Sequence, residues 1–414
     1  MNSDKTRVYL ERSNFSPIKL RLDERGGLSP HNPFLQIVPH ATGRLKSLII
    51  NGTSGNLQDI TPHLFRPAPL LEYLSISSHT PGLQHDPTLT TALFNGDIPS
   101  LRELSLQCVQ TELPWRNMVN LTSFELRGTM SYEVTVRQFL DFFESAPRLQ
   151  KIELINATPT SGAQNGRLVS LASLKWIDIV GDDPPSLLLD HLIIPIGAKL
   201  TTLGTSSGPL TENLLPRSLD NLRNLSDFTD IHLYIDEEDP DIRFSGPNGQ
   251  VRVFMPPQDN ATCLVLESLA RFDTSKTERI QIEYGYSPSS DPLYRALLPM
   301  KHLRTLTLSR CTSPDIFIHA LDPIMRLGDV ICPRLEDLVL VLHPDVETLD
   351  IKKVIEMAAG RASRGAKLKS VRIVSQDESM WIDALELRKH VSHVECGPGD
   401  GVADGDTDVS SEEE

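Results

Sequence analysis

The first residue that could do chemistry is Ser206, at the centre of the sequence GTSSG. This sequence matches the G-x-S-x-G turn that presents a nucleophilic serine between a strand and a helix in one class of hydrolases. The segment that follows, PLTEN (209–213), does not predict the required helix. We therefore expect Ser206 to lie in a loop, and catalysis by Ser206 is the alternative that the motif leaves open.

Two further motifs have the residue types of a metal site. Residues 404–408 begin like a calcium-binding loop, but Val409 stands where that loop needs glycine. His390, His393 and Cys396 offer zinc ligands, yet a fourth ligand and a second cluster are missing. We expect no catalytic residues, no metal site and no cofactor.

Composition limits the class of protein. The 414 residues are 39% hydrophobic and carry a net charge of −15, which argues against a nucleic-acid groove. The chain has no apolar run long enough to cross a membrane and no apolar signal-peptide core at its start. Its 5 scattered cysteines do not form a secreted disulfide framework. These features predict a protein of the cytoplasm, the nucleus or both, without membrane or nucleic-acid partners.

The elements that must position any site come from one recurring pattern, L-x-x-L-x-L. Its copies follow one another at steps of mostly about 20–30 residues, the spacing of leucine-rich repeats. Clear copies begin at Leu45, Leu71, Leu101, Leu121, Leu149, Leu174, Leu303, Leu335 and Leu368. Degenerate copies begin at Leu200, Phe228 and Thr277, and end copies at Phe15 and Val391.

Each copy predicts a short strand with one apolar and one polar face, because its fourth and sixth residues alternate with polar ones. Helices are expected between the strands. One spans 135–147 with Val136, Phe139, Leu140 and Phe143 on its apolar side, and another spans 350–360 with Ile351, Val354, Ile355 and Ala358, closed by Gly360.

The predicted fold is an α/β, irregular leucine-rich-repeat solenoid, a horseshoe with a concave parallel β-sheet and with helices and turns on the convex side. A barrel or doubly wound sheet is disfavoured because its strands would be continuously apolar. We expect this solenoid over 1–396, with a hairpin insertion at about 241–256 around Pro247-Asn248-Gly249. Residues 397–414 predict an acidic, disordered tail.

Cysteines add a family resemblance. Cys311 lies three residues after Leu308, and Cys332 directly precedes Pro333 in HLRTLTLSRC…CPRLEDLVL. These segments resemble the cysteine-containing leucine-rich repeats of F-box proteins. The segment VYLERSNFSPIKLRL (8–22) is similar to the one that follows the F-box in basidiomycete F-box-like proteins, whose irregular repeats continue as these do.

The resemblance implies a substrate receptor of a ubiquitin ligase, in which an F-box docks a Skp-type adaptor and, through it, a cullin. We find no F-box sequence in this chain, so we do not expect direct docking of the adaptor and cullin. Cys311 and Cys332 are expected to be small buried residues rather than redox groups.

The residues between the frame leucines are expected to face outward on the concave side and to contact a protein partner. Among them, Trp176 is the type of aromatic anchor that dominates interfaces. The predicted partner-binding residues are Tyr73, Glu103, Gln107, Glu125, Arg127, Lys151, Glu153, Trp176, Asp178, Asp230, His232, Tyr234, Arg279 and Glu283.

The sequence thus predicts a non-catalytic protein–protein interaction module that resembles the substrate-recognition repeats of an F-box-type ubiquitin ligase subunit. Three alternatives stay open: an adaptor-independent leucine-rich-repeat scaffold, a serine hydrolase that uses Ser206, and an extracellular repeat protein glycosylated at sites such as Asn51 or Asn156.

Overall fold

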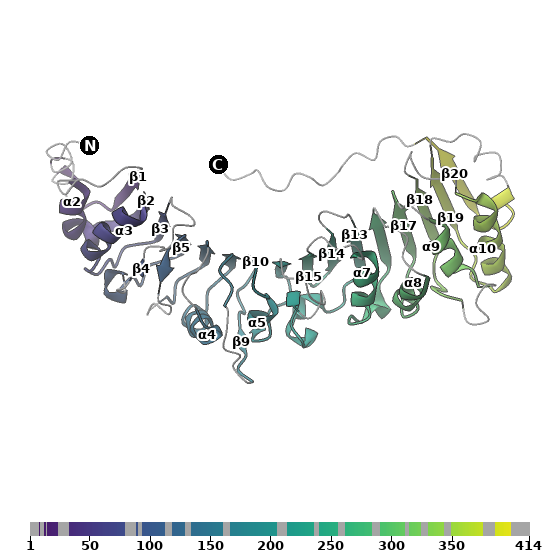
Figure 1. The fold of residues 1–414 in the computed structure, drawn as a ribbon, viewed down its shortest axis with the longest axis horizontal. Coiled ribbons are helices and arrows are strands. Elements are labelled where there is room, and N and C mark those ends of the chain that lie inside the picture. Colours follow the sequence, from purple (N-terminus) through teal and green to yellow (C-terminus); the bar gives the residue numbers. More distant parts are fainter. Residues whose placement is uncertain are drawn as a thin grey trace. The chain divides into compact units, whose positions relative to one another are not determined.

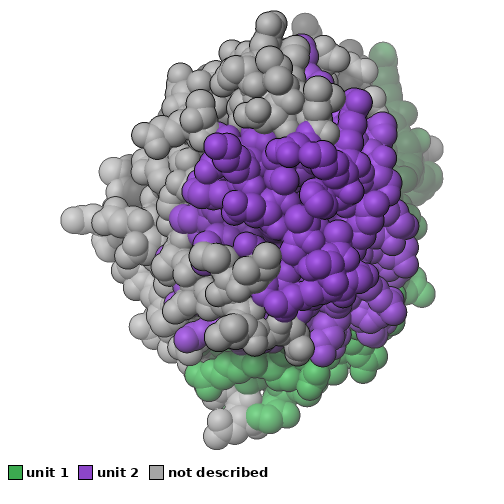
Figure 2. All heavy atoms as spheres, turned by 90° about the vertical axis from the view of Figure 1, so that its right-hand side faces the viewer, with its two compact units in different colours: residues 1–226, 248–256 green, residues 227–247, 257–414 purple. Residues whose placement is uncertain are grey.

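The structure is a computed structural model of the chain. It describes residues 8, 12–13, 15–23, 33–78, 88–89, 93–111, 118–128, 134–159, 166–204, 213–235, 240–255, 261–283, 290–310, 314–323, 330–342, 349–375 and 386–398. The chain divides into two compact units (Figure 2). Unit 1 comprises Met1–Ser226 and Asn248–Pro256, and unit 2 comprises Asp227–Pro247 and Pro257–Glu414.

The fold is mixed α/β, with a 16-stranded, mostly parallel sheet that is not closed into a barrel over the residues given above. In unit 1 the strand order is β1 (Ile18–Asp23), β2 (Leu45–Gly52), β3 (Tyr73–Ser78), β5 (Glu103–Gln107), β7 (Ser123–Arg127), β8 (Lys151–Ile155), β10 (Trp176–Gly181), β12 (Lys199–Gly204) and β15 (Gly249–Phe254). In unit 2 it is β14 (Asp241–Gly246), β13 (Asp230–Tyr234), β16 (Arg279–Glu283), β17 (Thr305–Ser309), β18 (Asp337–Val341), β19 (Ser370–Val374) and β20 (His393–Gly397). Within each unit every pair of neighbours is parallel except β13–β14.

Helices and turns connect these strands, and in each unit they lie on one side of them (Figure 1). Unit 1 holds α2 (Pro33–Ala41), α3 (Ser54–Ile60), α4 (Val136–Ser145), α5 (Ser186–Leu189) and the 3-10 helices η1 (Thr42–Arg44), η2 (Thr61–His63), η3 (Leu93–Gly96), η4 (Leu219–Asn221) and η5 (Arg223–Leu225). It also holds two short parallel pairs, β4 (Thr88–Leu89) with β6 (Gln110–Thr111) and β9 (Val169–Ser170) with β11 (Leu192–Ile193). Unit 2 holds α7 (Ala261–Leu269), η6 (Thr274–Lys276), α8 (Ser290–Leu297), α9 (Pro314–Leu321) and α10 (Ile351–Ser363).

The predicted strands are present, and their frame residues form the core. In β5 and β7, Leu104 pairs in register with Phe124 and Leu106 with Leu126, and all four side chains are at most 1% exposed. The clear frames from Leu45 to Leu174 and from Leu303 to Leu368 repeat this arrangement. Burial of every second side chain leaves the other strand face free of frame residues.

One degenerate frame and one end frame were assigned wrongly. Leu200 pairs with Ile177, so it is the fourth residue of its frame rather than the first, and Thr202 takes the sixth place at 0% exposure. The buried Oγ1 of Thr202 has no hydrogen-bonding partner among the described residues, and alternation along β12 turns Leu203 outward. At the start of the chain, Phe15 is 85% exposed and is not a frame residue.

The two predicted helices are present, with three changes in their buried residues and ends. Thr135 caps α4 in a reciprocal hydrogen-bonding box with Gln138, and Phe142 joins the predicted buried residues. Helix α10 does not close at Gly360 but continues to Ser363, and Gly365, with φ of +79°, follows its end. Met357 is fully buried, whereas Ile355, which the sequence assigned to the apolar side of the helix, is partly exposed.

Side chains just before the first frame leucine link successive turns of the chain in unit 1. Ser100 Oγ donates a hydrogen bond to the carbonyl of Pro69 at 2.6 Å, and Asn120 Nδ2 donates to that of Pro99 at 2.8 Å. Carbonyls at these positions have no partner within their own turn, so the neighbouring turn satisfies them.

A left-handed residue follows three adjacent strands of unit 1. Cys108, Gly128 and Asn156 have φ values of 50°, 112° and 51° after β5, β7 and β8. The backbone N–H of Gly128 donates to the carbonyl of Ile155 at 2.9 Å, and that of Cys108 donates to Arg127 at 2.6 Å. This conformation lets each strand end bond to the next strand before the chain turns toward the helix side.

Gly128→Ala tests this turn. A Cβ at Gly128 would lie 2.9 Å from the backbone N and Cα of Cys108, and φ of +112° is itself strained for alanine. We expect the substitution to lower the free energy of unfolding by about 1–3 kcal/mol, measured by urea denaturation. Gly43→Ala, whose Cβ would meet nothing within 4 Å, is the control. Equal effects of the two substitutions would contradict the explanation.

A buried arginine holds the chain before β18. Arg361 of α10 is 0% exposed, and its Nη1 and Nη2 donate to the carbonyls of Ile331 and Cys332 at 2.8 and 2.7 Å. Cys332 is buried as predicted, at 1% exposure, and burial raises the pKa of its thiol to about 12. Burial also lowers the pKa of Arg361. The planar fork of the guanidinium therefore anchors a segment that lacks regular secondary structure.

Arg361→Lys keeps the charge and removes the fork. We expect it to lower the free energy of unfolding by about 1–3 kcal/mol, because one buried carbonyl loses its donor. Arg364→Lys, at an exposed position after the same helix, is the matched control and should change stability by less than about 0.5 kcal/mol. A stable Arg361→Lys variant would show that the two hydrogen bonds do not hold this segment.

Candidate functional site

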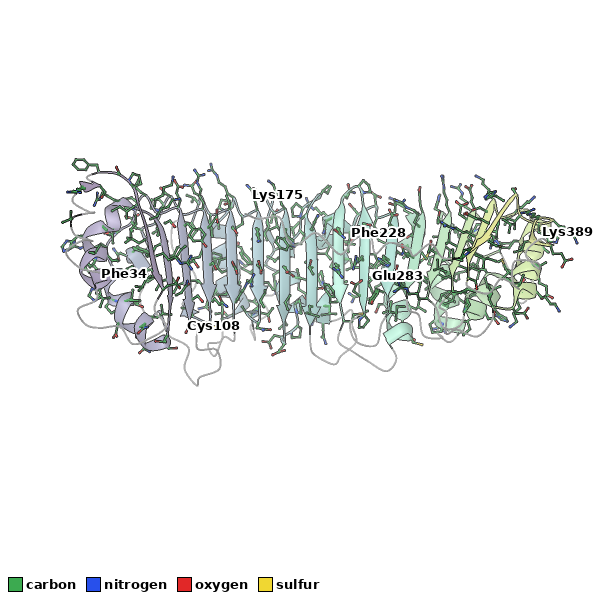
Figure 3. All side chains as sticks on the ribbon, turned by 90° about the horizontal axis from the view of Figure 1, so that it is seen from above. Phe34, Cys108, Lys175, Phe228, Glu283 and Lys389 are labelled. Atoms are coloured by element: carbon green, nitrogen blue, oxygen red, sulfur yellow. The ribbon has the colours of Figure 1, made fainter. Side chains whose placement is uncertain are left out.

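The candidate site is the strand face whose side chains alternate with the buried frame residues, which we call the open face. Figure 3 looks down on the strands, with Glu283 of β16 labelled. All predicted partner-binding residues lie on the open face of one unit or the other. Unit 1 carries Tyr73, Glu103, Gln107, Glu125, Arg127, Lys151, Glu153, Trp176 and Asp178, and unit 2 carries Asp230, His232, Tyr234, Arg279 and Glu283.

Register aligns the open face of unit 1 in three rows that cross the strands. The first row runs through Glu103, Ser123, Lys151, Trp176, Lys199 and Gln250. The middle row runs through Ser105, Glu125, Glu153, Asp178, Thr201 and Arg252. The last row runs through Gln107, Arg127, Ile155, Val180, Leu203 and Phe254.

Glu153 is the centre of an ion-pair cluster. It forms a charged hydrogen bond with Arg127, and Lys151 Nζ lies 3.7 Å from its Oε2. Arg127 also pairs with Glu125, Nε to Oε1, at 2.5 Å. With two cations over it, Glu153 is only 6% exposed, less than the alternation along β8 predicts. It therefore positions its neighbours and offers little surface of its own to a partner.

Asp178 is the carboxylate that this cluster leaves uncompensated. It lies in register beside Glu153, and its buried Oδ1 has no hydrogen-bonding partner among the described residues. Burial, followed by the negative charge of Glu153, raises the pKa of Asp178 to about 6. Lys151 and Arg127 oppose that rise without cancelling it. Asp178 therefore places a partly exposed carboxylate, one oxygen of which is buried and unsatisfied, on the open face.

Trp176 lies beside this carboxylate in the first row. Its side chain is partly exposed, and the ammonium of Lys151 lies 4.5 Å from its ring centroid. A cation over the ring face holds the indole in place by a cation–π interaction. Trp176 is thus a positioned aromatic group on the open face, partly covered by a neighbouring strand's side chain.

The last row contains a feature that the sequence analysis missed. Ile155, Val180, Leu203 and Phe254 stand side by side on four adjacent strands, and each is partly exposed. The wrong frame at Leu200 placed Leu203 in the core, and the hairpin interpretation kept Phe254 out of the sheet. The sequence does carry a signal for this row. In KIELI and WIDIV an apolar residue, Ile155 or Val180, directly follows the sixth residue of the frame.

In unit 2 the open face carries a second set of charged neighbours. His232 Nε2 lies 3.5 Å from Glu283 Oε1, and Gln281 Nε2 donates to the same oxygen at 2.5 Å. The hydrogen bond from His232 lowers the pKa of Glu283. Arg279 forms an ion pair with Asp230 on the neighbouring strand. The set pairs its charges internally, although the buried Nε2 of His232 finds no described partner in good hydrogen-bond geometry.

A polar groove of about 590 Å³ also lies in unit 1, along the starts of β3, β5, β7 and β8. Arg102 and Arg148 line it together with Glu72 and Glu103, and the rest of its lining is Ser, Thr, Asn and Gln. Exposed groups of both signs alternate there. The groove lacks the convergent charge that would select one small ligand.

Several predicted motifs lie outside the described residues: Ser206, Cys311 and the acidic segment 399–414. The possible zinc ligands are described, and His393 and Cys396 lie on β20, where Cys396 pairs with Ile373 as a frame residue. No group of His, Cys, Asp or Glu in the described ranges is arranged to hold a metal ion. Within the same ranges, every helix is too short or too polar to cross a bilayer.

Comparison with protein-family models and with curated proteins found no match to this chain. The interpretation of the site therefore depends on its geometry and chemistry.

The raised pKa of Asp178 predicts a pH-dependent stability difference. A carboxyl whose pKa rises from 3.8 to about 6 on folding binds its proton more tightly in the folded chain. Its ionisation therefore opposes folding above about pH 6, and this effect fades as the pH falls toward 3.8. We expect Asp178→Asn to exceed wild type in free energy of unfolding at pH 7.5, with a difference that shrinks by pH 4.5.

Urea unfolding of the two proteins over this pH range measures the difference. Glu103→Gln, an exposed acid of the same face, is the control and should show no such trend. A pH-independent difference for Asp178→Asn would mean that this carboxyl is not desolvated.

Proposed function

We propose that the chain is a leucine-rich-repeat solenoid that binds a protein partner through its open face, in the role of a substrate receptor like those of F-box-type ubiquitin ligases. The observation that carries this proposal is the set of in-register rows on the open face of unit 1, where a positioned aromatic side chain, an unsatisfied carboxylate and an apolar row adjoin one another. A positioned aromatic side chain beside apolar ones is typical of a protein interface, and the carboxylate adds a charge that a partner can match.

The strand pattern supports the repeat assignment. Successive strands in each unit pair in parallel, the frame leucines form the core, and the helices lie on one side of the strands. One such turn cannot bury its own apolar face, whereas a stack of turns can. The residues on the opposite face are then left for recognition.

The charges on the open face favour a protein over a polyanion. Glu125, Glu153 and Asp178 stand in one row of unit 1, with Arg127 and Lys151 in the adjoining rows. A nucleic-acid surface needs clustered cations without interposed carboxylates. A protein partner can supply both signs and an apolar side chain.

Trp176→Ala tests this role. If the chain is a substrate receptor, this variant should bind its protein partner about thirtyfold more weakly. That is the effect of removing an interface anchor that contributes about 2 kcal/mol. The wild type and the variant would be expressed in the source cells, and proteins crosslinked to each would be quantified by isotope-labelled mass spectrometry. The best candidate would then be purified and its Kd measured by calorimetry.

Arg137→Glu, on the exposed side of α4, is the control and should retain the partner. Equal loss from both variants, or retention by both, would contradict binding through the open face. A purified Skp-type adaptor and cullin would be titrated in parallel. Their binding supports the ligase role, and binding of the partner without them supports the adaptor-independent scaffold instead.

A further inference from the structure

We infer that the last row of unit 1 is the binding site for an amphipathic α-helix of the partner protein. This helix would cross the strands with a basic residue facing Asp178. The inference deepens the proposed function and rests on it. It assigns a shape and a chemistry to the partner.

The apolar row supplies the contact area. Ile155, Val180, Leu203 and Phe254 lie on β8, β10, β12 and β15, which pair in parallel without a break. Each is partly exposed where a strand face turned to water would carry polar residues. The guanidinium of Arg252 lies 4.0 Å from the ring centroid of Phe254, so a cation covers part of the ring at the end of the row.

Spacing selects a helix over an extended segment. Neighbouring strands lie about 4.8 Å apart, so the four side chains span about 14 Å across the sheet. Helix residues at i, i+3, i+7 and i+10 span about 15 Å at a rise of 1.5 Å per residue. Four same-side residues of an extended segment would span about 20 Å and would lose register with the row.

Asp178 sets the charge of the helix. The middle row lies about 7 Å from the last row along the strands, within reach of a side chain on the flank of a helix about 10 Å wide. The buried Oδ1 of Asp178 has no hydrogen-bonding partner in the described part of the chain. The carboxylate as a whole is partly exposed, so a lysine or arginine from the helix would pair with it, whereas Glu153 already has two cations. The complementary helix is therefore apolar on one side and basic beside that stripe.

The probe is a displayed library of 20-residue, alanine-rich helices with one randomised face, selected on the full chain. A second library with a central proline supplies non-helical peptides. We expect the helical library to enrich apolar residues at i, i+3, i+7 and i+10 with a flanking Lys or Arg. Enrichment of the proline library alone, or no enrichment over an empty support, would overturn the inference.

Variants then locate the bound peptide. Val180→Glu and Leu203→Glu should each raise the Kd of the selected peptide at least tenfold in fluorescence anisotropy, and Asp178→Asn should raise it several-fold. Ile49→Glu is the matched control, because Ile49 is an apolar, partly exposed residue on the open face at β2. The selected peptide should bind Ile49→Glu with the same Kd as wild type. Thermal melts of all variants verify folding, and unchanged affinity in folded Val180→Glu and Leu203→Glu would overturn the inference.

The same variants separate this inference from the proposed function. A partner protein that is lost with Trp176→Ala but retained by Val180→Glu and Leu203→Glu would uphold the open face as the binding surface. It would overturn the helix-binding site in the last row. A partner retained by all three variants would overturn both.

Discussion

Parallel pairing in register is the constraint on which the rest of the structure depends. In unit 1, Leu104 of β5 pairs with Phe124 of β7, and Ile152 of β8 pairs with Ile177 of β10. Because side chains alternate along a strand, this register decides at once which residues enter the core and which form rows on the open face. A slip of one residue would exchange the two sets.

The same register creates the chemistry of the open face. It brings Glu153 and Asp178 together on neighbouring strands, although they are far apart in sequence. Two adjacent carboxylates oppose each other's ionisation. Arg127 and Lys151 both pair with Glu153, whereas burial, and then the charge of Glu153, raise the pKa of Asp178. An apolar row beside this pair then follows from the residue after the sixth frame place in each of β8, β10, β12 and β15.

The sequence predicted the strands well because their signal is local. A frame such as that at Leu101 combines period-two alternation with a repeat spacing, and both survive in one sequence. The frame at Leu200 failed because KLTTLGT permits two registers, and only the pairing of Leu200 with Ile177 selects between them. The length of α10 was misjudged at Gly360, since a buried helix tolerates a glycine where an exposed one would end.

The site was harder to predict because its properties arise between strands. The outward direction of Trp176 and Asp178 follows from alternation along β10 alone. The cation over Trp176, the burial of Glu153 and the unsatisfied Oδ1 of Asp178 depend on which side chain the next strand places beside each. No single segment of the sequence encodes those neighbours.

Comparison with its neighbours in the middle row indicates that Asp178 does not stabilise the fold. Ser105 and Thr201 occupy the same row on other strands and suit a parallel sheet without a charge to desolvate. A serine or threonine in place of Asp178 would keep the strand and remove an uncompensated carboxylate from beside Glu153. The fold thus carries a destabilising charge next to an apolar row that the described helices of unit 1, on the other side of the strands, do not cover. An unpaired charge of this kind is expected where a surface is complementary to a binding partner. Contact with the partner would pair the charge and bury the apolar row together.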